Sequence, residues 1–450
     1  MERSNINRYN RQELIEGWDQ KKLRDASITI VGADLLGQYI LIPLLALGVG
    51  KLRILGNEKI RKGFFLDLKL KDNIAISLES LVNDINPDVD MIGLKSSILN
   101  KGSSYLLKGT DIVIDATNDP FSKTLTLDYC KLNNIPMISA GCDGSFGRII
   151  ASDYNNNDIR IVMPDFEGKS QEELVSMVLG GLIAEEVKKI VMQKEKLKVS
   201  LYYNLTNKNR FTFERSKDYK EFEGNFSDKG VLMIGAGALG NFVGLGLAKL
   251  GVGRIDILDD DEVEDTNLNR QILYYDCVGS KKSEALAEKL QKISDGNSKV
   301  NGYVKRFDDK TKLTEKYDII FDCVDNFKTR AEISNYAVKN KIPLISGATD
   351  YQAGQVAVYI PKITPSIDYQ LKLKDSAKKR EEEAGQSCIL APNPSVIMTN
   401  QVIGGLMIGE SRTIFDPDKF GEPIGGILKY GTNLENRLGI NVILKEKKNA

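Results

Sequence analysis

The chain contains no histidine, and this absence excludes several kinds of catalytic site. Its 450 residues offer no imidazole to act as a general base, to activate a serine or cysteine nucleophile, or to bind a metal. The five cysteines are scattered and include no Cys-x-x-Cys pair, so we expect no zinc site. Few and unpaired cysteines also favour a reducing compartment.

Net charge and long apolar runs are missing as well. The 62 basic residues balance the 62 acidic residues, which argues against nucleic acid or an acidic membrane as a partner. The longest apolar stretch, residues 39–50, is too short to cross a bilayer and contains Pro43. Because the N-terminus is polar and is not a signal peptide, we expect a cytoplasmic protein.

An internal repeat organises the chain. ITIVGADLLGQYILIPLLALGVGKLRIL (28–55) is similar to VLMIGAGALGNFVGLGLAKLGVGRIDIL (231–258), and both predict a strand, a glycine turn, a helix and a second strand. Three further pairs follow in the same order: 111–123 with 318–330, 133–149 with 340–356, and 178–186 with 402–410. Strands that alternate with helices predict an α/β fold with two doubly wound, Rossmann-like, mostly parallel sheets.

The repeat also suggests how the chain divides into domains. We predict a first repeat over residues 1–200 and a second over residues 201–414. The second includes a charge-rich crossover loop at 361–395, and a C-terminal extension with two strands follows at 415–450.

The glycine turn of the second repeat predicts a phosphate site. Gly235, Gly237 and Gly240 let the backbone approach a phosphate, and the following helix supplies N–H donors. Asp259 ends the next strand, where an acid can accept hydrogen bonds from ribose. The pattern fits a dehydrogenase as well as an ATP site. In the first repeat Asp34 replaces the middle glycine with bulk and negative charge, so we expect no nucleotide there.

Polar residues beyond Asp259 favour a triphosphate. Asn267, Arg270 and Lys282 follow it, and a dinucleotide would need no further cations because the glycine turn already meets its pyrophosphate. Surface ion pairs are the alternative interpretation of the two cations. Asp325 follows the strand that starts at residue 318, where a carboxylate can bind Mg²⁺.

Taken together, these motifs are recognisable. The strings GAGALG, LDDDEVEDTNLNRQ, VGSKK, DCVDNFKTR and ISGATDYQAGQV resemble the ThiF/MoeB-type adenylyltransferases, the family of ubiquitin-activating enzymes, as does the opening string RYNRQ (8–12). The first repeat resembles a degraded copy, because residues 56–73 lack the NLNRQ motif and Asn118 stands where the second repeat has Asp325. The resemblance therefore implies a fused, monomeric pseudo-dimer with one working site.

The resemblance also implies residue roles. The ATP site would comprise Gly235, Gly237, Gly240, Asp259, Asp261, Asn267, Arg270 and Lys282. In that site the glycines would line the nucleotide, Asp259 would bind ribose, and Asn267, Arg270 and Lys282 would hold the phosphates. Asp325 would bind Mg²⁺, and Arg11 of the opening motif would reach the site from the first repeat.

The implied reaction needs no histidine. The C-terminal carboxylate of a small ubiquitin-like or sulfur-carrier protein, a β-grasp protein ending in Gly-Gly, would attack ATP, and that carboxylate is already ionised at pH 7. Cys388 matches the position at which small family members accept the acyl group as a thioester, whereas an ordinary loop cysteine is the alternative. A conjugating enzyme or a sulfur transferase would then be a further partner.

Three other functions stay open at this point. The same fold and ATP site would serve to adenylate a peptide or a small carboxylate without forming a thioester. A non-catalytic binding module is the second alternative. A dehydrogenase is the third, although the chain offers no obvious acid for hydride transfer.

Overall fold

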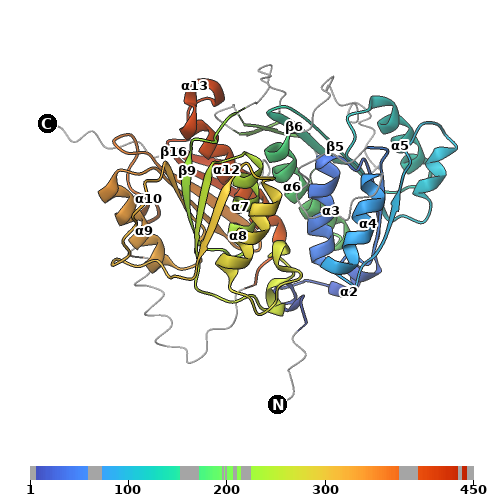
Figure 1. The fold of residues 1–450 in the computed structure, drawn as a ribbon. Helices are drawn as coiled ribbons and strands as arrows, with labels where there is room; N and C mark the ends of the chain where they lie inside the picture. The colour runs from blue at the N-terminus through green and yellow to red at the C-terminus, as the bar shows by residue number, and fades with distance from the viewer. Residues whose placement is uncertain are drawn as a thin grey trace, which may run out of the picture.

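The computed structural model describes most of the chain as two α/β halves. The described residues are 7–58, 73–152, 172–194, 197, 200–205, 210–213, 224–373, 375, 394–433 and, for the backbone alone, 438–442. In Figure 1 the first half, blue to green, lies beside the second half, yellow-green to red. Both halves have the same order of core elements, which confirms the predicted repeat and the α/β fold.

The first half forms one eight-stranded sheet with the order β3-β2-β1-β4-β5-β6-β7-β8. Strands β1 to β5 pair in parallel, and β6, β7 and β8 are added in antiparallel fashion. The strands are β1 (Ser27–Val31), β2 (Lys51–Leu55), β3 (Asp90–Leu94), β4 (Ile112–Asp115), β5 (Met137–Asp143), β6 (Phe146–Ser152), β7 (Leu201–Asn204) and β8 (Phe211–Thr212).

The second half repeats this topology strand for strand. Its order is β11-β10-β9-β12-β13-β14-β15-β16, with β9 to β13 parallel and the last three strands antiparallel. The strands are β9 (Gly230–Ile234), β10 (Arg254–Leu258), β11 (Lys299–Tyr303), β12 (Ile319–Asp322), β13 (Leu344–Thr349), β14 (Ala353–Tyr359), β15 (Gly426–Gly431) and β16 (Leu438–Val442). The two strands predicted after residue 415 therefore continue this sheet.

Both faces of each sheet are buried, as expected for a doubly wound fold. Along β9, Val231 and Met233 belong to one hydrophobic cluster, whereas Leu232 and Ile234 belong to another. In the first half the α-helices are α1 (Asn10–Glu13), α2 (Gln20–Asp25), α3 (Leu35–Leu47), α4 (Ile74–Ile85), α5 (Pro120–Leu132) and α6 (Glu173–Val191). In the second half they are α7 (Ala238–Lys249), α8 (Lys282–Ile293), α9 (Phe327–Asn340), α10 (Ile367–Leu371), α12 (Ile397–Phe415) and α13 (Pro417–Phe420). Short 3₁₀ helices include η1 (Ser103–Leu107), η3 (Asp265–Asn267) and η4 (Ile272–Tyr274).

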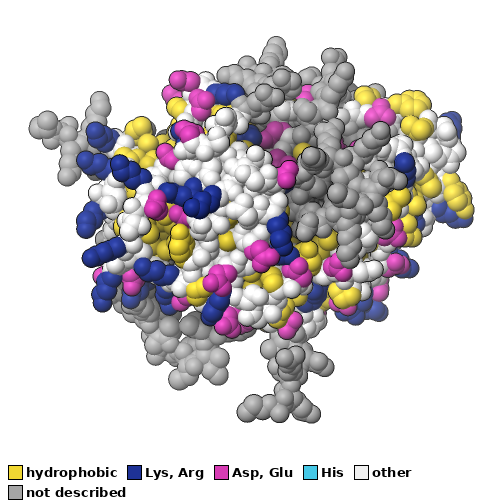
Figure 2. Space-filling model, in the orientation of Figure 1, with side chains coloured by type: hydrophobic (Ala, Val, Ile, Leu, Met, Phe, Trp, Pro, Cys, Tyr) yellow, Lys and Arg dark blue, Asp and Glu magenta, His cyan; other side chains and the backbone are white. Residues whose placement is uncertain are grey.

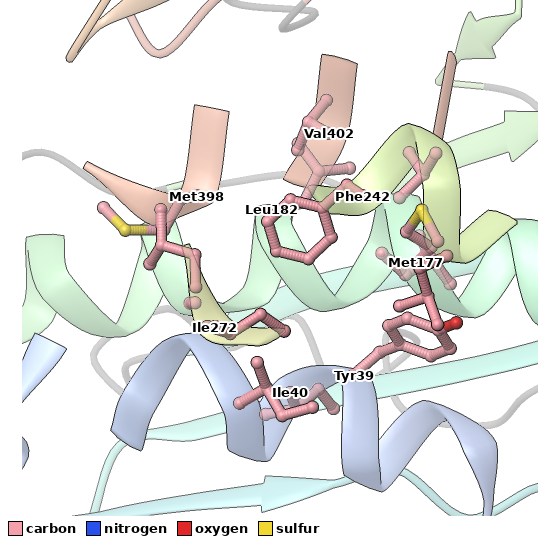
Figure 3. Packing of buried hydrophobic residues seen from close by; sticks show 14 of the residues in the cluster. Tyr39, Ile40, Met177, Leu182, Phe242, Ile272, Met398 and Val402 are labelled. Atoms are coloured by element: carbon pink, nitrogen blue, oxygen red, sulfur yellow. The ribbon is translucent and has the colours of Figure 1, made fainter. Parts of the chain in front are cut away.

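Helices α6 and α12 pack against each other where the two halves meet. A Cβ on Gly181 of α6 would lie 2.8 Å from Cγ2 of Val402, and one on Gly405 of α12 would lie 2.6 Å from Cγ2 of Val178. Small residues at matching positions thus let the two helices approach closely. Figure 3 shows apolar side chains of α3, α6, α7, η4 and α12 packed together, so one hydrophobic core spans both halves.

The first sheet continues past residue 200. Strands β7 and β8 extend the first sheet to Thr212, beyond residue 200, at which we predicted the first repeat to end. The division at residues 200 and 414 stays a prediction.

Basic and acidic side chains are interspersed over the second half on the face shown in Figure 2. In the part of the chain that the structure describes, no helix combines the length and apolar character needed to cross a membrane.

Candidate nucleotide site

The glycine turn between β9 and α7 leaves an opening at one position. Gly235 has a φ of +98°, and a Cβ there would lie 2.8 Å from the carbonyl carbon of Cys323. A Cβ on Gly240 would lie 2.3 Å from the carbonyl oxygen of Gly235. By contrast, a Cβ on Gly237 would meet no atom within 4 Å. The first and third glycines are needed by the turn itself, and the middle glycine leaves room for a ligand at the N-terminus of α7.

Two buried side chains that the sequence analysis missed hold this turn in place. The hydroxyl of Tyr274 lies 2.7 Å from the carbonyl oxygen of Ala236 and 3.1 Å from that of Lys282. The amide of Asn241 donates to the carbonyl oxygen of Gly237 at 3.0 Å. A tyrosine inside the apolar string QILYY was the available signal, because a buried tyrosine hydroxyl usually finds a partner.

Asp259 is fixed by the same turn. Its Oδ2 accepts a hydrogen bond from the backbone N–H of Ala236 at 2.6 Å, and its Oδ1 accepts one from Asp261 N–H at 2.9 Å. Burial raises the pKa of this carboxyl, although the two N–H donors and Lys282 act in the opposite direction. Asp259 thus joins the glycine turn to the end of β10, and ribose binding by its remaining lone pairs stays a prediction.

Lys282 and Asn267 lie where β10 leads into α8. The Nζ of Lys282 forms an ion pair with Asp261 at 2.9 Å, and the lysine residue is only 8% exposed. Asn267 is also buried, and its Oδ1 accepts a hydrogen bond from the N–H of Glu264 at 3.0 Å. In this structure both predicted phosphate ligands therefore have protein partners that orient them.

Arg270 is a half-buried cation that forms no ion pair with any of the described acids. Its Nη1 donates to the carbonyl oxygen of Thr266 at 2.7 Å and to Oδ1 of Asn269 at 2.8 Å. Burial, together with the positive charge of Arg11, lowers the pKa of Arg270 to about 10, whereas Glu264 acts to raise it. The guanidinium is thus still charged at pH 7. Among the described residues, no acid forms an ion pair with it, so an anion would be a favourable partner.

Arg11 reaches this place from the first half. It lies in α1, whose backbone contacts the second half where the carbonyl oxygen of Arg11 accepts a hydrogen bond from Ser395 N–H at 3.2 Å. The next residue, Gln12, accepts a hydrogen bond from Asn269 Nδ2 at 3.4 Å. Arg11 of the first half therefore lies close enough to Arg270 of the second half for the two charges to act on each other.

A metal ion could be held at two places, by Asp325 or by a cluster of three acids that follows β10. Asp325 is exposed in the turn between β12 and α9, and one exposed carboxylate suits Mg²⁺, which takes most of its ligands from phosphates and water. Asp259, Asp260 and Asp261 bring their carboxylate oxygens within 4.8 Å of one another. Exposed acids of this kind are common without a metal, and Mg²⁺ binding by Asp325 stays a prediction.

The predicted nucleophile, Cys388, lies outside the described residues. The described cysteines do not offer an alternative nucleophile. Cys130, Cys142 and Cys323 are buried, and Cys277 is half-buried. Burial raises the pKa of Cys142 to about 12 and that of Cys277 to about 11, so both are thiols at neutral pH.

The corresponding place in the first half is altered at three positions. Asp34 stands at the position of Gly237, and Gly56 stands where the second half has Asp259. Asn118, at the position of Asp325, is tied to strand β5, because its Nδ2 donates to the carbonyl oxygen of Cys142 at 2.6 Å. The segment that replaces the NLNRQ motif falls mostly on residues 59–72, outside the described part of the chain.

The family assignment follows from two matches along the chain. The model of the ThiF family matches residues 8–225 and, a second time, residues 220–441. The chain belongs to the ThiF family. This finding confirms the resemblance, and it assigns one ThiF repeat to each sheet.

Curated relatives match a shorter part of this ThiF-family chain. It is 42% identical over 131 residues to the adenylyltransferase and sulfurtransferase MOCS3 of Aedes aegypti, and this match covers 29% of this chain and 30% of that protein. It is 36% identical over 133 residues to the adenylyltransferase and sulfurtransferase UBA4 of Yarrowia lipolytica, covering 29% of this chain and 33% of that protein. The chain therefore matches less than half the length of either relative.

The solved structures that match part of this chain include E. coli MccB with ATP. That chain is 22% identical, with a TM-score of 0.43, and the match covers 50% of this chain and 65% of MccB.

Proposed function

We propose that the second half binds ATP and adenylates the C-terminal carboxylate of a small carrier protein of the ubiquitin-like or sulfur-carrier kind. Two observations carry the proposal: the positive charges of Arg11 and Arg270 act on each other across the two halves, and the glycine turn is open at Gly237. A polyanion would offset the repulsion between these two cations, because Arg270 is half-buried and its hydrogen-bond partners are neutral oxygens. The names of the curated relatives, which include adenylyltransferase and sulfurtransferase, support a carrier protein as the substrate.

The chemistry suits the residues of the site. A carboxylate oxygen of the substrate forms a bond to the α-phosphorus of ATP, the bond from that phosphorus to the bridging oxygen breaks, and pyrophosphate leaves with the electron pair. No proton moves, because a C-terminal carboxyl group with a pKa of about 3.5 is ionised at pH 7. Arg11, Arg270 and Lys282 supply the positive charge that the transition state needs, in fixed positions.

Magnesium fits this site without further protein ligands. Asp325 would hold the ion, which when bound would neutralise part of the phosphate charge. The protein residues then have three tasks. The backbone around Gly237 accommodates the phosphates, the ion pair with Asp261 orients Lys282, and the first half holds Arg11 in place.

An exchange assay tests the proposal. The protein is incubated with ATP, Mg²⁺, labelled pyrophosphate and a β-grasp protein that ends in Gly-Gly, and we expect label to enter ATP. The same β-grasp protein without its two terminal glycines is the substrate control, and Lys282→Ala is the enzyme control; both should abolish exchange. The proposed carrier substrate is refuted if no encoded β-grasp protein supports exchange while a short peptide does, and that result favours peptide adenylation instead.

Thioester transfer to Cys388 is a second step that rests on sequence position alone. The thiolate of Cys388 would attack the acyl carbon of the adenylate, and AMP would leave with the electron pair. We expect an adduct that a thiol reductant cleaves and that Cys388→Ala abolishes. Exchange without such an adduct would leave adenylation as the whole activity.

A further inference from the structure

A chain of buried amides runs from Arg270 in the second half to Trp18 in the first. Asn269 Oδ1 accepts from Arg270 at 2.8 Å, and Asn269 Nδ2 donates to Gln12 Oε1 at 3.4 Å. Gln12 Nε2 donates to Gln20 Oε1 at 2.7 Å, and the indole N–H of Trp18 donates to the same oxygen at 2.9 Å. Gln12 and Asn269 are completely buried, so water does not replace these bonds.

The orientation of every amide in this chain is determined by its ends. Leu47 contributes a carbonyl oxygen that accepts from Gln12 at 3.0 Å and from Gln20 at 2.8 Å. A carbonyl oxygen can only accept and an indole N–H can only donate. If the amide of Gln20 were reversed, its nitrogen would face the N–H donors of Gln12 and Trp18. Its oxygen would face the carbonyl oxygen of Leu47, which can only accept. Gln20 and Gln12 must each turn their Nε2 toward Leu47, which leaves the oxygen of Gln12 facing Asn269.

The same logic extends across the interface to Arg270. Because the oxygen of Gln12 faces Asn269, the amide nitrogen of Asn269 must point toward Gln12. Its oxygen is then directed at Arg270, whose guanidinium can only donate. The first half thus determines which atom of Asn269 meets the cation, although no residue of the first half touches the guanidinium in this chain of bonds.

We propose that Gln12 and Asn269 are positioning residues that hold the Arg270 guanidinium beside Arg11, ready for the phosphates of ATP. This inference rests on the proposed function, since it assumes that ATP is the ligand. Arg11 and Arg270 repel each other, and the partners of Arg270 are neutral oxygens. Without the oxygen of Asn269, the guanidinium would turn away from the second cation, and the geometry for phosphate would be lost.

The first test compares ATP with adenosine. Gln12→Met and Asn269→Leu preserve side-chain length or volume while removing the hydrogen bonds. We expect each variant to bind a non-hydrolysable ATP analogue about tenfold more weakly and to bind adenosine with unchanged affinity. Asn269→Leu removes the hydrogen bond to the charged guanidinium, and Gln12→Met removes the group that orients Asn269. The double variant should bind no more weakly than the weaker single variant, because the two residues act in series.

Gln38→Met is the matched control for this comparison. Gln38 is a completely buried amide in the first half, and its Nε2 donates to the carbonyl oxygen of Ala33 at 2.8 Å. Its loss should lower the melting temperature but leave the ratio of ATP to adenosine affinity unchanged. If Gln12→Met does not fold, Gln12→Asn, which is too short to span the same contacts, replaces it.

The second test does not depend on nucleotide. Trp18 is the single tryptophan of the chain, so a ¹⁵N-labelled sample gives one indole N–H resonance. We expect Asn269→Leu, in the other half, to shift this resonance, and Gln38→Met to leave it in place. An unshifted resonance would contradict the ordered chain of amides.

The outcomes separate the two proposals. If the wild-type protein binds no ATP analogue, the proposed function fails, and the role in holding ATP phosphates fails with it. In the other case, the wild-type protein binds ATP while Gln12→Met lowers the affinities for ATP and adenosine equally, or while it changes neither affinity. Either result refutes only the positioning role of Gln12.

Discussion

The two halves have nearly the same backbone and opposite side-chain chemistry at the glycine turn. Gly237 has φ −72° and ψ −156°, and Asp34, at the same position of the first half, has φ −71° and ψ −170°. Glycine is therefore not needed at this position for its conformation, since both residues adopt an extended backbone. The comparison shows that the difference between the halves lies in the space and the charge that a side chain brings.

The comparison extends to a buried ion pair below each turn. In the second half Arg330 Nη1 lies 3.3 Å from Asp322, and in the first half Lys123 Nζ lies 3.0 Å from Asp115. All four side chains are almost completely buried. Because the first half retains the buried ion pair while its glycine turn has changed, we infer that it serves as a scaffold that supplies Arg11.

The substitution that most directly turns the second half into the first is Gly237→Asp. We expect ATP affinity to fall by at least about 100-fold, because the side chain occupies the open space and its charge repels phosphate. Gly237→Ala is the control and should bind ATP within about threefold of wild type. Calorimetric titration with a non-hydrolysable analogue measures both. Binding by Gly237→Asp at wild-type affinity would remove the reason for expecting no nucleotide in the first half.

Arg11→Ala tests what the first half contributes. We expect the rate of pyrophosphate exchange to fall by about 10³-fold, by analogy with arginines supplied in trans to phosphoryl transfer. The melting temperature should hardly change, since the backbone bond from Ser395 to Arg11 remains. Arg8→Ala is the matched control, because Arg8 lies in the same segment but donates to the carbonyl oxygen of Ile85 at 2.9 Å. A large loss of stability in Arg11→Ala, with exchange retained, would make Arg11 structural.

Lys123→Met tests whether the first half is a scaffold. Removing one partner of a buried pair leaves the carboxylate of Asp115 unpaired, so we expect the free energy of unfolding to fall by about 3–5 kcal/mol. ATP affinity, measured well below the melting temperature, should stay the same. Urea unfolding measures the first quantity. A loss below about 1 kcal/mol would show that the pair does not stabilise the first half.

The smallest expected effect concerns the cysteines. Burial raises the pKa of Cys142 to about 12 and that of Cys277 to about 11, and it raises the pKa of Cys323 well above its usual range. A raised pKa leaves little thiolate at pH 8, so these cysteines should react slowly with iodoacetamide. Mass spectrometry of partly labelled protein should find Cys388 labelled first. Faster labelling of Cys277 would argue against a reactive thiol at Cys388.

Sequence alone predicted the repeat, the glycine turn and the cations, because each depends on residues that are close together in the chain or recur in it. The family resemblance implied that Arg11 reaches the site from the first half. Its charge acts on Arg270 in the structure, and its role toward ATP stays a prediction. The role of Tyr274 and the chain through Gln12 and Asn269 were missed. These contacts depend on the packing of distant segments, and an amide in a sequence does not reveal which partner it will find.

Asp259 shows a different limit of prediction. The end of a strand correctly predicted where the acid lies, but its two oxygens bind backbone N–H groups of Ala236 and Asp261. In the same way, Asp34 was expected to exclude a nucleotide by its bulk and charge, and the accompanying loss of an acid at Gly56 went unnoticed because glycine gives no chemical signal. Position along the sequence thus locates a group better than it identifies its partners.

Calorimetric titration of wild type and Arg11→Ala with a non-hydrolysable ATP analogue tests the central claim most directly. We predict one nucleotide per chain, bound at least about tenfold more weakly when Arg11 is replaced, because the cation reaches the phosphates from the first half. Two nucleotides per chain, or binding that is indifferent to Arg11, would contradict a single ATP site shared by the two halves.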